Sequence, residues 1–171
     1  MYKFLFFSFC LLGSSAFAQK FDPADTEAQY KAQYEQRIKK ERLFGRYIPK
    51  DLNDAFAQFD ILIEEKDRMG FKKLTEEDAY HKLFFSFHRW IINNWGFDGG
   101  SRFSHYLKSI GLSHPEDMAT FVLLTYHRKL NSKELGIKEL ATKLKDNRKN
   151  GYKLYQKKGK VIEEFKAPKK E

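Results

Sequence analysis

The stretch from Thr75 to Trp95 constrains the fold more than any other part of the chain. At about 100° per residue along a helix, its large apolar side chains fall on most of the circumference. They are Leu83, Phe84, Phe85, Phe87, Trp90, Ile91, Ile92 and Trp95. Such a helix has to be covered on nearly all sides, so the pattern predicts a central buried helix, about 75–95, with other helices packed around it.

Capping residues, glycines and prolines place the remaining elements. Asp22, Asp51, Thr75 and Ser113 each precede a stretch with helical periodicity, and Gly96 and Gly111 end one. The expected helices span about 22–43, 51–63, 75–95, 102–110, 114–130 and 136–147. The predicted fold class is therefore all-α, a compact bundle of five or six helices.

Several core residues follow from the same periodicity. They lie on apolar faces at helical spacing, and we assign them to packing. They are Phe87, Trp90, Ile91, Trp95, Tyr106, Met118 and Val122. His88 and Asn94 also fall inside the apolar arc of the central helix, where we expect their hydrogen bonds to go to neighbouring backbone.

The first eighteen residues have the pattern of a secretory signal peptide. Lys3 gives a positive start, residues 4–12 are apolar, and Ala16 and Ala18 are the small residues that a signal peptidase reads before Gln19. The apolar run is about half the length that a membrane anchor needs. Lipidation at Cys10 would require a small residue before it, and Phe9 stands there. We expect a protein exported to the periplasm or secreted.

The distribution of charge divides the rest of the chain. Residues 19–142 hold 20 basic and 19 acidic side chains, whereas residues 143–171 hold 11 basic and 4 acidic ones. We expect an N-terminal amphipathic helix within 19–45, a helical domain at 46–142 and a basic tail at 143–171. Within the tail, residues 152–156 and 161–165 flank a glycine turn and predict a short β-hairpin. The near-neutral charge of the domain argues against nucleic acid as a partner.

The order of motifs from Ile48 to about Leu130 resembles a small bacterial domain family of unknown function. The shared segments are Trp-Ile-x-x-Asn-Trp-Gly at residues 90–96, Gly-Ser-Arg at 100–102 and His-Pro-Glu-Asp-Met at 114–118. The resemblance implies a compact helical domain and no particular chemistry. It does not extend to the first helix or to the basic tail.

The best candidate ligand site is the loop before the fourth helix. Gly99 and Gly100 allow a close backbone approach, and Ser101 and Arg102 stand beside the free amides of the helix start, which is the geometry of an anion site. Asp98 counts against it, since a carboxylate repels anions. Glycine pairs also serve ordinary turns.

The histidines suggest little chemistry. His105 and His114 could assist Arg102 in a ligand site, but the chain has no spacing typical of a zinc site. Adjacent carboxylates on a helix diverge by about 100°, so they do not converge on one bond. We therefore expect no metal, no cofactor and no assigned catalytic residue.

Three functions remain open. The first is an exported, non-catalytic binding or interaction module for an unknown protein or envelope component. Its candidate surfaces are the stripe of Tyr30, Tyr34 and Ile38, the loop at 98–102 and the tail lysines. The second is a small hydrolase or transferase for an anionic envelope substrate that uses Arg102 with His105 or His114. The third is salt-sensitive binding of an anionic surface by the tail.

Overall fold

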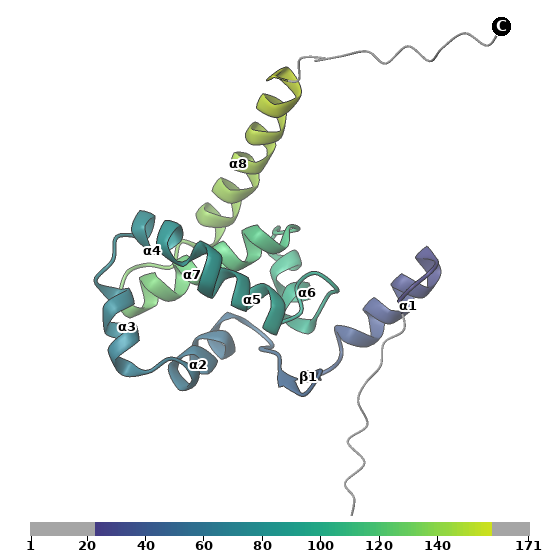
Figure 1. Cartoon of the computed structure of the whole chain (residues 1–171), viewed down its shortest axis with the longest axis horizontal. Coiled ribbons are helices and arrows are strands. Elements are labelled where there is room, and N and C mark those ends of the chain that lie inside the picture. Colours follow the sequence, from purple (N-terminus) through teal and green to yellow (C-terminus); the bar gives the residue numbers. More distant parts are fainter. Residues whose placement is uncertain (1–22, 159–171) are drawn as a thin grey trace, which may run out of the picture.

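The computed structural model describes residues 23–158, apart from the side chains of residues 84, 85 and 152–158. This part of the chain is mostly helical, as the all-α prediction requires, and it has one two-stranded hairpin. The elements are α1 (Glu27–Arg37), β1 (Arg42–Leu43), β2 (Arg46–Tyr47), α2 (Leu52–Leu62), α3 (Glu65–Lys72), α4 (Glu76–Leu83), the π-helix η1 (Phe84–His88), α5 (Arg89–Asn94), α6 (Arg102–Ser109), α7 (Pro115–Leu130) and α8 (Ile137–Lys158). Helices α2 to α7 form one body, with α1 beside it and α8 projecting from it (Figure 1).

Helix α7 lies at the centre of this body. It contacts α2, α3, α4, η1, α5, α6 and α8. Buried side chains run along it from Met118 to His127 and include polar Thr120 and Thr125. We expected residues 75–95 to hold the central position. The structure does not confirm that arrangement, because that stretch lies against α7 and keeps one exposed strip, Lys82, Ser86, Arg89 and Asn93.

Residues 75–95 also form three consecutive segments instead of one regular helix. Thr75 caps the start, as predicted, since its Oγ1 accepts a hydrogen bond of 3.0 Å from the amide of Asp78. The chain then runs from α4 through the π-helix η1 into α5. A π-helix widens the turn by one residue, and such turns occur frequently at functional sites.

The core is built around Phe59 of α2, which is fully buried. Its ring centroid lies 4.7 Å from Trp95, 4.9 Å from Phe87 and 4.9 Å from Tyr126. Of the expected core residues, Ile91, Trp95, Met118 and Val122 are buried. The other three, Phe87, Trp90 and Tyr106, are partly buried and pack against the core.

The N-terminal region departs from the expected single helix at 22–43. Helix α1 begins at a capping box between Thr26 and Gln29 and ends at Arg37. The chain then turns back at Phe44 and Gly45, both with positive φ, and pairs β1 with β2. Strand β1 therefore lies where the last turn of the expected helix was predicted.

Other expected boundaries also need correction. Helix α3 follows the second helix where no separate helix was expected. Helix α7 begins at Pro115, and its N-cap residue is His114, with no side-chain cap hydrogen bond, in place of the expected Ser113. Helix α8 continues to Lys158, so residues 152–156 are helical and do not form the first strand of the predicted hairpin. The second strand, at 161–165, lies outside the described residues. So do the predicted signal peptide and its cleavage residues.

Candidate functional site

The structure places the glycine loop under α1. Ser101 caps α6 and exchanges hydrogen bonds with Ser104, whose amide donates to Ser101 Oγ at 3.2 Å while Ser104 Oγ accepts from the Ser101 amide at 2.8 Å. The side chains of Arg37 and Tyr34 cover Gly99 and Gly100. Tyr34 of the α1 stripe therefore packs on this loop. We had considered the stripe and the loop as separate partner sites.

Arg102 joins the start of α6 to the segment before α2. Its Nε donates to the carbonyl oxygen of Ile48 at 2.7 Å, and its Nη2 lies 3.9 Å from Asp54 Oδ2. Its guanidinium carbon is 5.0 Å from the centroid of the Tyr47 ring. These contacts are intramolecular, and they direct the side chain toward Ile48 and Asp54.

The two candidate histidines lie apart from Arg102. His105 Nδ1 is 3.1 Å from the hydroxyl of Tyr34, on the surface that α1 covers. His114 lies at the start of α7, where its Nδ1 is 3.8 Å from Glu116 Oε2. His114 lines a groove between α4, α7 and α8 that neither Arg102 nor His105 lines, so the three side chains do not share that groove. The arrangement does not support the proposed hydrolase set.

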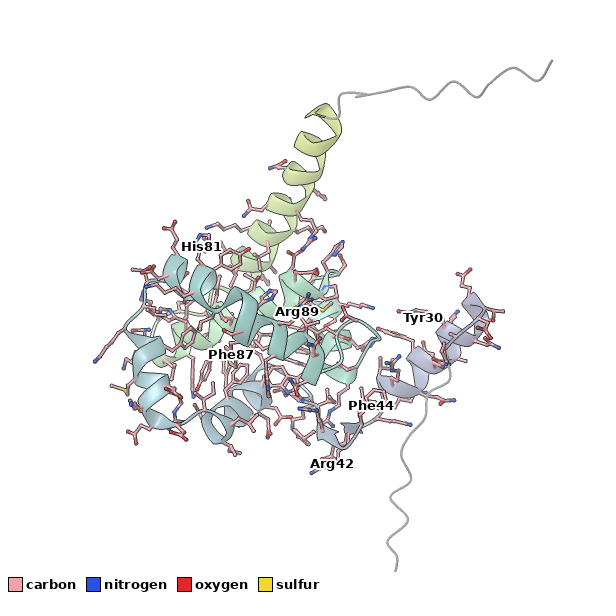
Figure 2. All side chains as sticks on the ribbon, viewed as in Figure 1. Tyr30, Arg42, Phe44, His81, Phe87 and Arg89 are labelled. Carbon is pink, nitrogen blue, oxygen red and sulfur yellow. The ribbon has the colours of Figure 1, made fainter. Side chains whose placement is uncertain are left out.

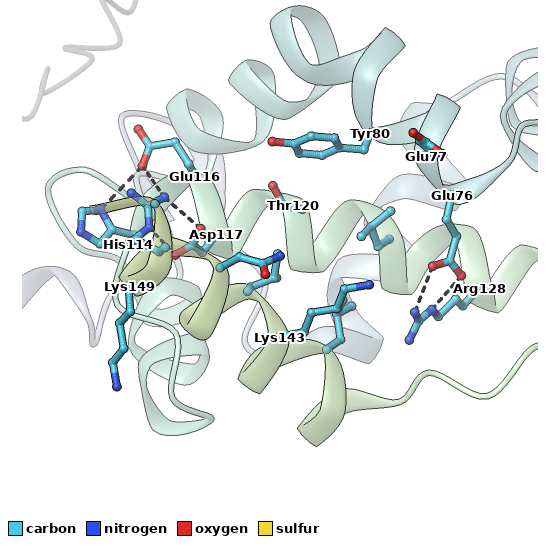
Figure 3. A pocket seen from close by; sticks show the side chains of 16 residues that line it. Glu76, Glu77, Tyr80, His114, Glu116, Asp117, Thr120, Arg128, Lys143 and Lys149 are labelled. Atoms are coloured by element: carbon cyan, nitrogen blue, oxygen red, sulfur yellow. Dashed lines mark hydrogen bonds and ion pairs between the residues drawn. The ribbon is translucent and has the colours of Figure 1, made fainter. Parts of the chain in front are cut away.

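A groove of about 1330 Å³ lies between α4, α7 and α8. Figure 3 shows its α4 wall with Tyr80 and its α8 wall with Lys143. Leu124, Leu140 and Leu144 provide its apolar surface. The α7 residues that line it include Glu116, Thr120, Leu124 and Arg128, which recur every four residues and so form one strip of the helix.

Two bidentate ion pairs stand at the ends of the groove. Arg128 Nε and Nη2 each donate to a carboxylate oxygen of Glu76 at 2.9 Å, which ties α7 to α4. Arg148 Nε and Nη2 donate to Asp117 at 2.5 Å and 2.9 Å, which ties α8 to α7. The Arg128 hydrogen bonds lower the pKa of Glu76 against the opposing effect of burial. Glu76 is therefore ionised near neutral pH and cannot act there as a general acid.

His88 connects η1 to two α7 residues that line the groove. The Nε2 of this buried histidine lies 2.8 Å from the carbonyl oxygen of Glu116 and 3.2 Å from Thr120 Oγ1. Since a carbonyl oxygen only accepts, Nε2 carries the proton and donates it. Burial lowers the pKa of His88 below its ordinary value, so the ring is neutral at neutral pH. The expected backbone hydrogen bond of His88 is thus present.

Residues 23–158 contain neither a candidate metal cluster nor a candidate membrane-spanning helix. No group of three or more His, Cys, Asp and Glu side chains in this range could hold a metal ion. In the same range, no helix has both the length and the hydrophobicity needed to cross a bilayer.

Residues 48–130 match the model of a family described as a domain of unknown function, DUF6794. The match covers just under half of the chain, and we call residues 48–130 the DUF6794 domain. The resemblance expected from its three motifs is confirmed at the level of the family. No curated protein matches the chain, and no solved structure does either.

The DUF6794 domain begins just before α2 and ends with α7. Helices α1 and α8 lie outside it, and each packs against it. The groove therefore has two walls from the DUF6794 domain and one from α8. A similar division holds for the glycine loop, which belongs to the domain and is covered by α1.

Sequence reasoning missed the groove because it depends on where α8 lies against α4 and α7. The signal available was the strip of Glu116, Thr120, Leu124 and Arg128, which mixes polar and apolar side chains on one face of α7. The matching strip on α8 includes Leu140, Leu144 and Arg148. Only the packing of the two helices turns these strips into one lined site.

Proposed function

We propose that this protein is an exported, non-catalytic binding module that holds its ligand in the groove between α4, α7 and α8. The observation that carries the proposal is the groove itself, which has an apolar surface, charged side chains around it and a bidentate ion pair at each end. Convergent polar groups around an apolar concavity are typical of binding sites.

The size and chemistry of the groove favour a peptide segment as the ligand. Small-molecule pockets usually measure about 300 to 1000 Å³, and this groove is larger at about 1330 Å³. The stretch of α7 from Asp117 to Arg128 is about 16 Å long, and an extended peptide of about five residues has the same length. The groove therefore has room for several side chains of a peptide.

The charges on the groove favour an acidic group in that peptide. Among the described side chains, Lys143 and Lys149 take part in no ion pair, and both line the groove from α8. Glu77 is the corresponding acidic residue on the α4 side. The carboxylates of Glu76 and Asp117 are paired with arginines, and Glu116 lies 3.7 Å from the same Arg148, so the two unpaired lysines outnumber the unpaired Glu77.

Export rests on the predicted signal peptide. Cell fractionation and the mass of the intact protein test it directly. We expect the protein in the envelope or outside the cell, with Gln19 as its first residue. A cytoplasmic protein that retains residues 1–18 would contradict this part of the proposal.

Capture of partners from an envelope extract tests the groove. The bait is the protein from Gln19 onward, compared with Asn147→Trp, which fills the groove from an exposed position on α8. The matched control is Asn150→Trp, on the same helix and outside the groove lining. A partner retained by the unsubstituted protein and by Asn150→Trp, but lost with Asn147→Trp, supports the proposal. Retention by all three baits would contradict it.

A further inference from the structure

Helix α1 places Tyr34 and Arg37 against the DUF6794 domain and leaves Tyr30 50% exposed (Figure 2). None of its residues is buried. The hydroxyl of Tyr34 lies 3.1 Å from His105 Nδ1 and accepts from Lys108 Nζ at 3.5 Å. The same ammonium lies 4.5 Å from the centroid of the Tyr34 ring, within the range of a cation–π contact.

The surface under α1 is shaped by the absence of two side chains. A Cβ atom added at Gly100 would collide with the ring of Tyr34, and one added at Gly99 would collide with the guanidinium of Arg37. Gly100 has a φ of +86°. The loop and α6 thus form a shallow surface that contacts the phenol ring of Tyr34 and the guanidinium of Arg37. The two groups come from positions three residues apart on a helix.

We propose that this surface, formed by Gly99, Gly100, His105 and Lys108, is a docking site for a helical segment that presents Tyr and Arg three residues apart. Helix α1 occupies the site within the same chain, and a partner segment with the same pair replaces it. Replacement is feasible because α1 lies outside the DUF6794 domain and has no buried residue. This site is separate from the groove and does not depend on the function proposed for it.

A labelled peptide of residues 25–39 tests the site by fluorescence anisotropy. The receptor is the protein from Gln19 onward with Tyr34→Ala and Arg37→Ala, which vacates the surface without removing a buried residue. We expect the peptide to bind this variant, and to bind the unsubstituted protein at least about tenfold more weakly. The weaker binding follows because the attached helix competes at an effective concentration of about millimolar.

Variants of the surface show whether the peptide uses it. Added to the vacated protein, Gly100→Ala should weaken binding about tenfold, which corresponds to about 1.4 kcal/mol. Gly45→Ala is the matched control, because Gly45 has a similar φ of +78° and nothing within 4 Å of an added Cβ. A peptide with Tyr34→Phe keeps the ring and loses the hydroxyl, and should bind about fivefold more weakly. Asn147→Trp should leave peptide binding unchanged.

Circular dichroism and thermal unfolding establish that each variant is folded. If the doubly substituted protein is unfolded, the vacated receptor is made with Tyr34→Ala alone. The proposal is overturned if the peptide fails to bind a folded, vacated protein. It is equally overturned if Gly45→Ala and Gly100→Ala weaken binding to the same extent.

Discussion

At the residue scale, paired charges have the clearest structural role. Arg128 and Arg148 each form a bidentate pair with a carboxylate, and the four side chains hold α4, α7 and α8 in register. Local sequence patterns do not predict these pairs, because the paired residues are 52 and 31 positions apart in the chain. By contrast, the caps at Asp51 and Thr75 were predicted correctly, since each involves a residue three positions away.

Glu76→Gln tests the pair with Arg128. The two side chains are 32% and 20% exposed, so we expect a loss of about 1 kcal/mol in the free energy of unfolding near neutral pH. The folded pKa of Glu76 lies below its ordinary value of 4.5. Its contribution is therefore complete above pH 4.5 and is lost as the pH falls through the folded pKa. Urea unfolding across this range should show the two proteins converging in acid. A constant difference would contradict the assignment.

At the element scale, α2 shows how far periodicity alone determines burial. The apolar residues at helical spacing in α2 are Leu52, Ala55, Phe56, Phe59 and Leu62. The first four are buried, and Leu62 is 55% exposed. The helix ends at Leu62, and the chain leaves the core there to begin α3. The pattern identified the face, but it could not locate where the neighbouring elements stop covering it.

Leucine substitutions at the two ends of α2 provide a matched test. Leu52→Ala removes a 3% exposed side chain, and we expect a loss of about 2 to 5 kcal/mol in the free energy of unfolding. Leu62→Ala, in the same helix, should change it by less than about 0.5 kcal/mol. Chemical denaturation of both variants is sufficient. Similar losses at the two positions would show that α2 does not pack as described.

The junction between η1 and α7 makes stability depend on pH. Burial lowers the folded pKa of His88 below its ordinary value of 6.5, against the smaller opposing effects of the Glu116 carbonyl and nearby carboxylates. Because the unfolded chain takes up the proton first, stability is greatest above pH 6.5 and falls as the pH drops toward the folded pKa. The cause is local, since the imidazole has to be neutral to remain buried.

His88→Gln separates this effect from other titrations. The glutamine amide can donate to the Glu116 carbonyl but does not ionise. Free energies of unfolding at about pH 7.5 and about pH 5 should differ less in the variant than in the unsubstituted protein. An NMR titration of His88 provides an independent value of its pKa. Equal pH dependence in the two proteins would rule out the proposed role of His88.

At the scale of the whole molecule, a DUF6794 domain carries one added helix on each side. Local signals predicted the all-α class, the helix ends at Gly96 and Gly111, and the family. They did not predict that α8 runs through the expected boundary at 142/143 and forms a wall of the groove. They also did not predict that α1 covers the glycine loop. Both features depend on contacts between distant segments, which periodicity does not encode.

Site-specific photo-crosslinking in the native cell tests the central claim most directly. A photoreactive residue replaces Asn147 in the groove, and the control replaces Asn93, an exposed asparagine on the outer strip of α5. We predict one protein partner crosslinked from position 147 and absent from position 93. The same products from both positions, or none from position 147, would contradict a ligand-binding groove.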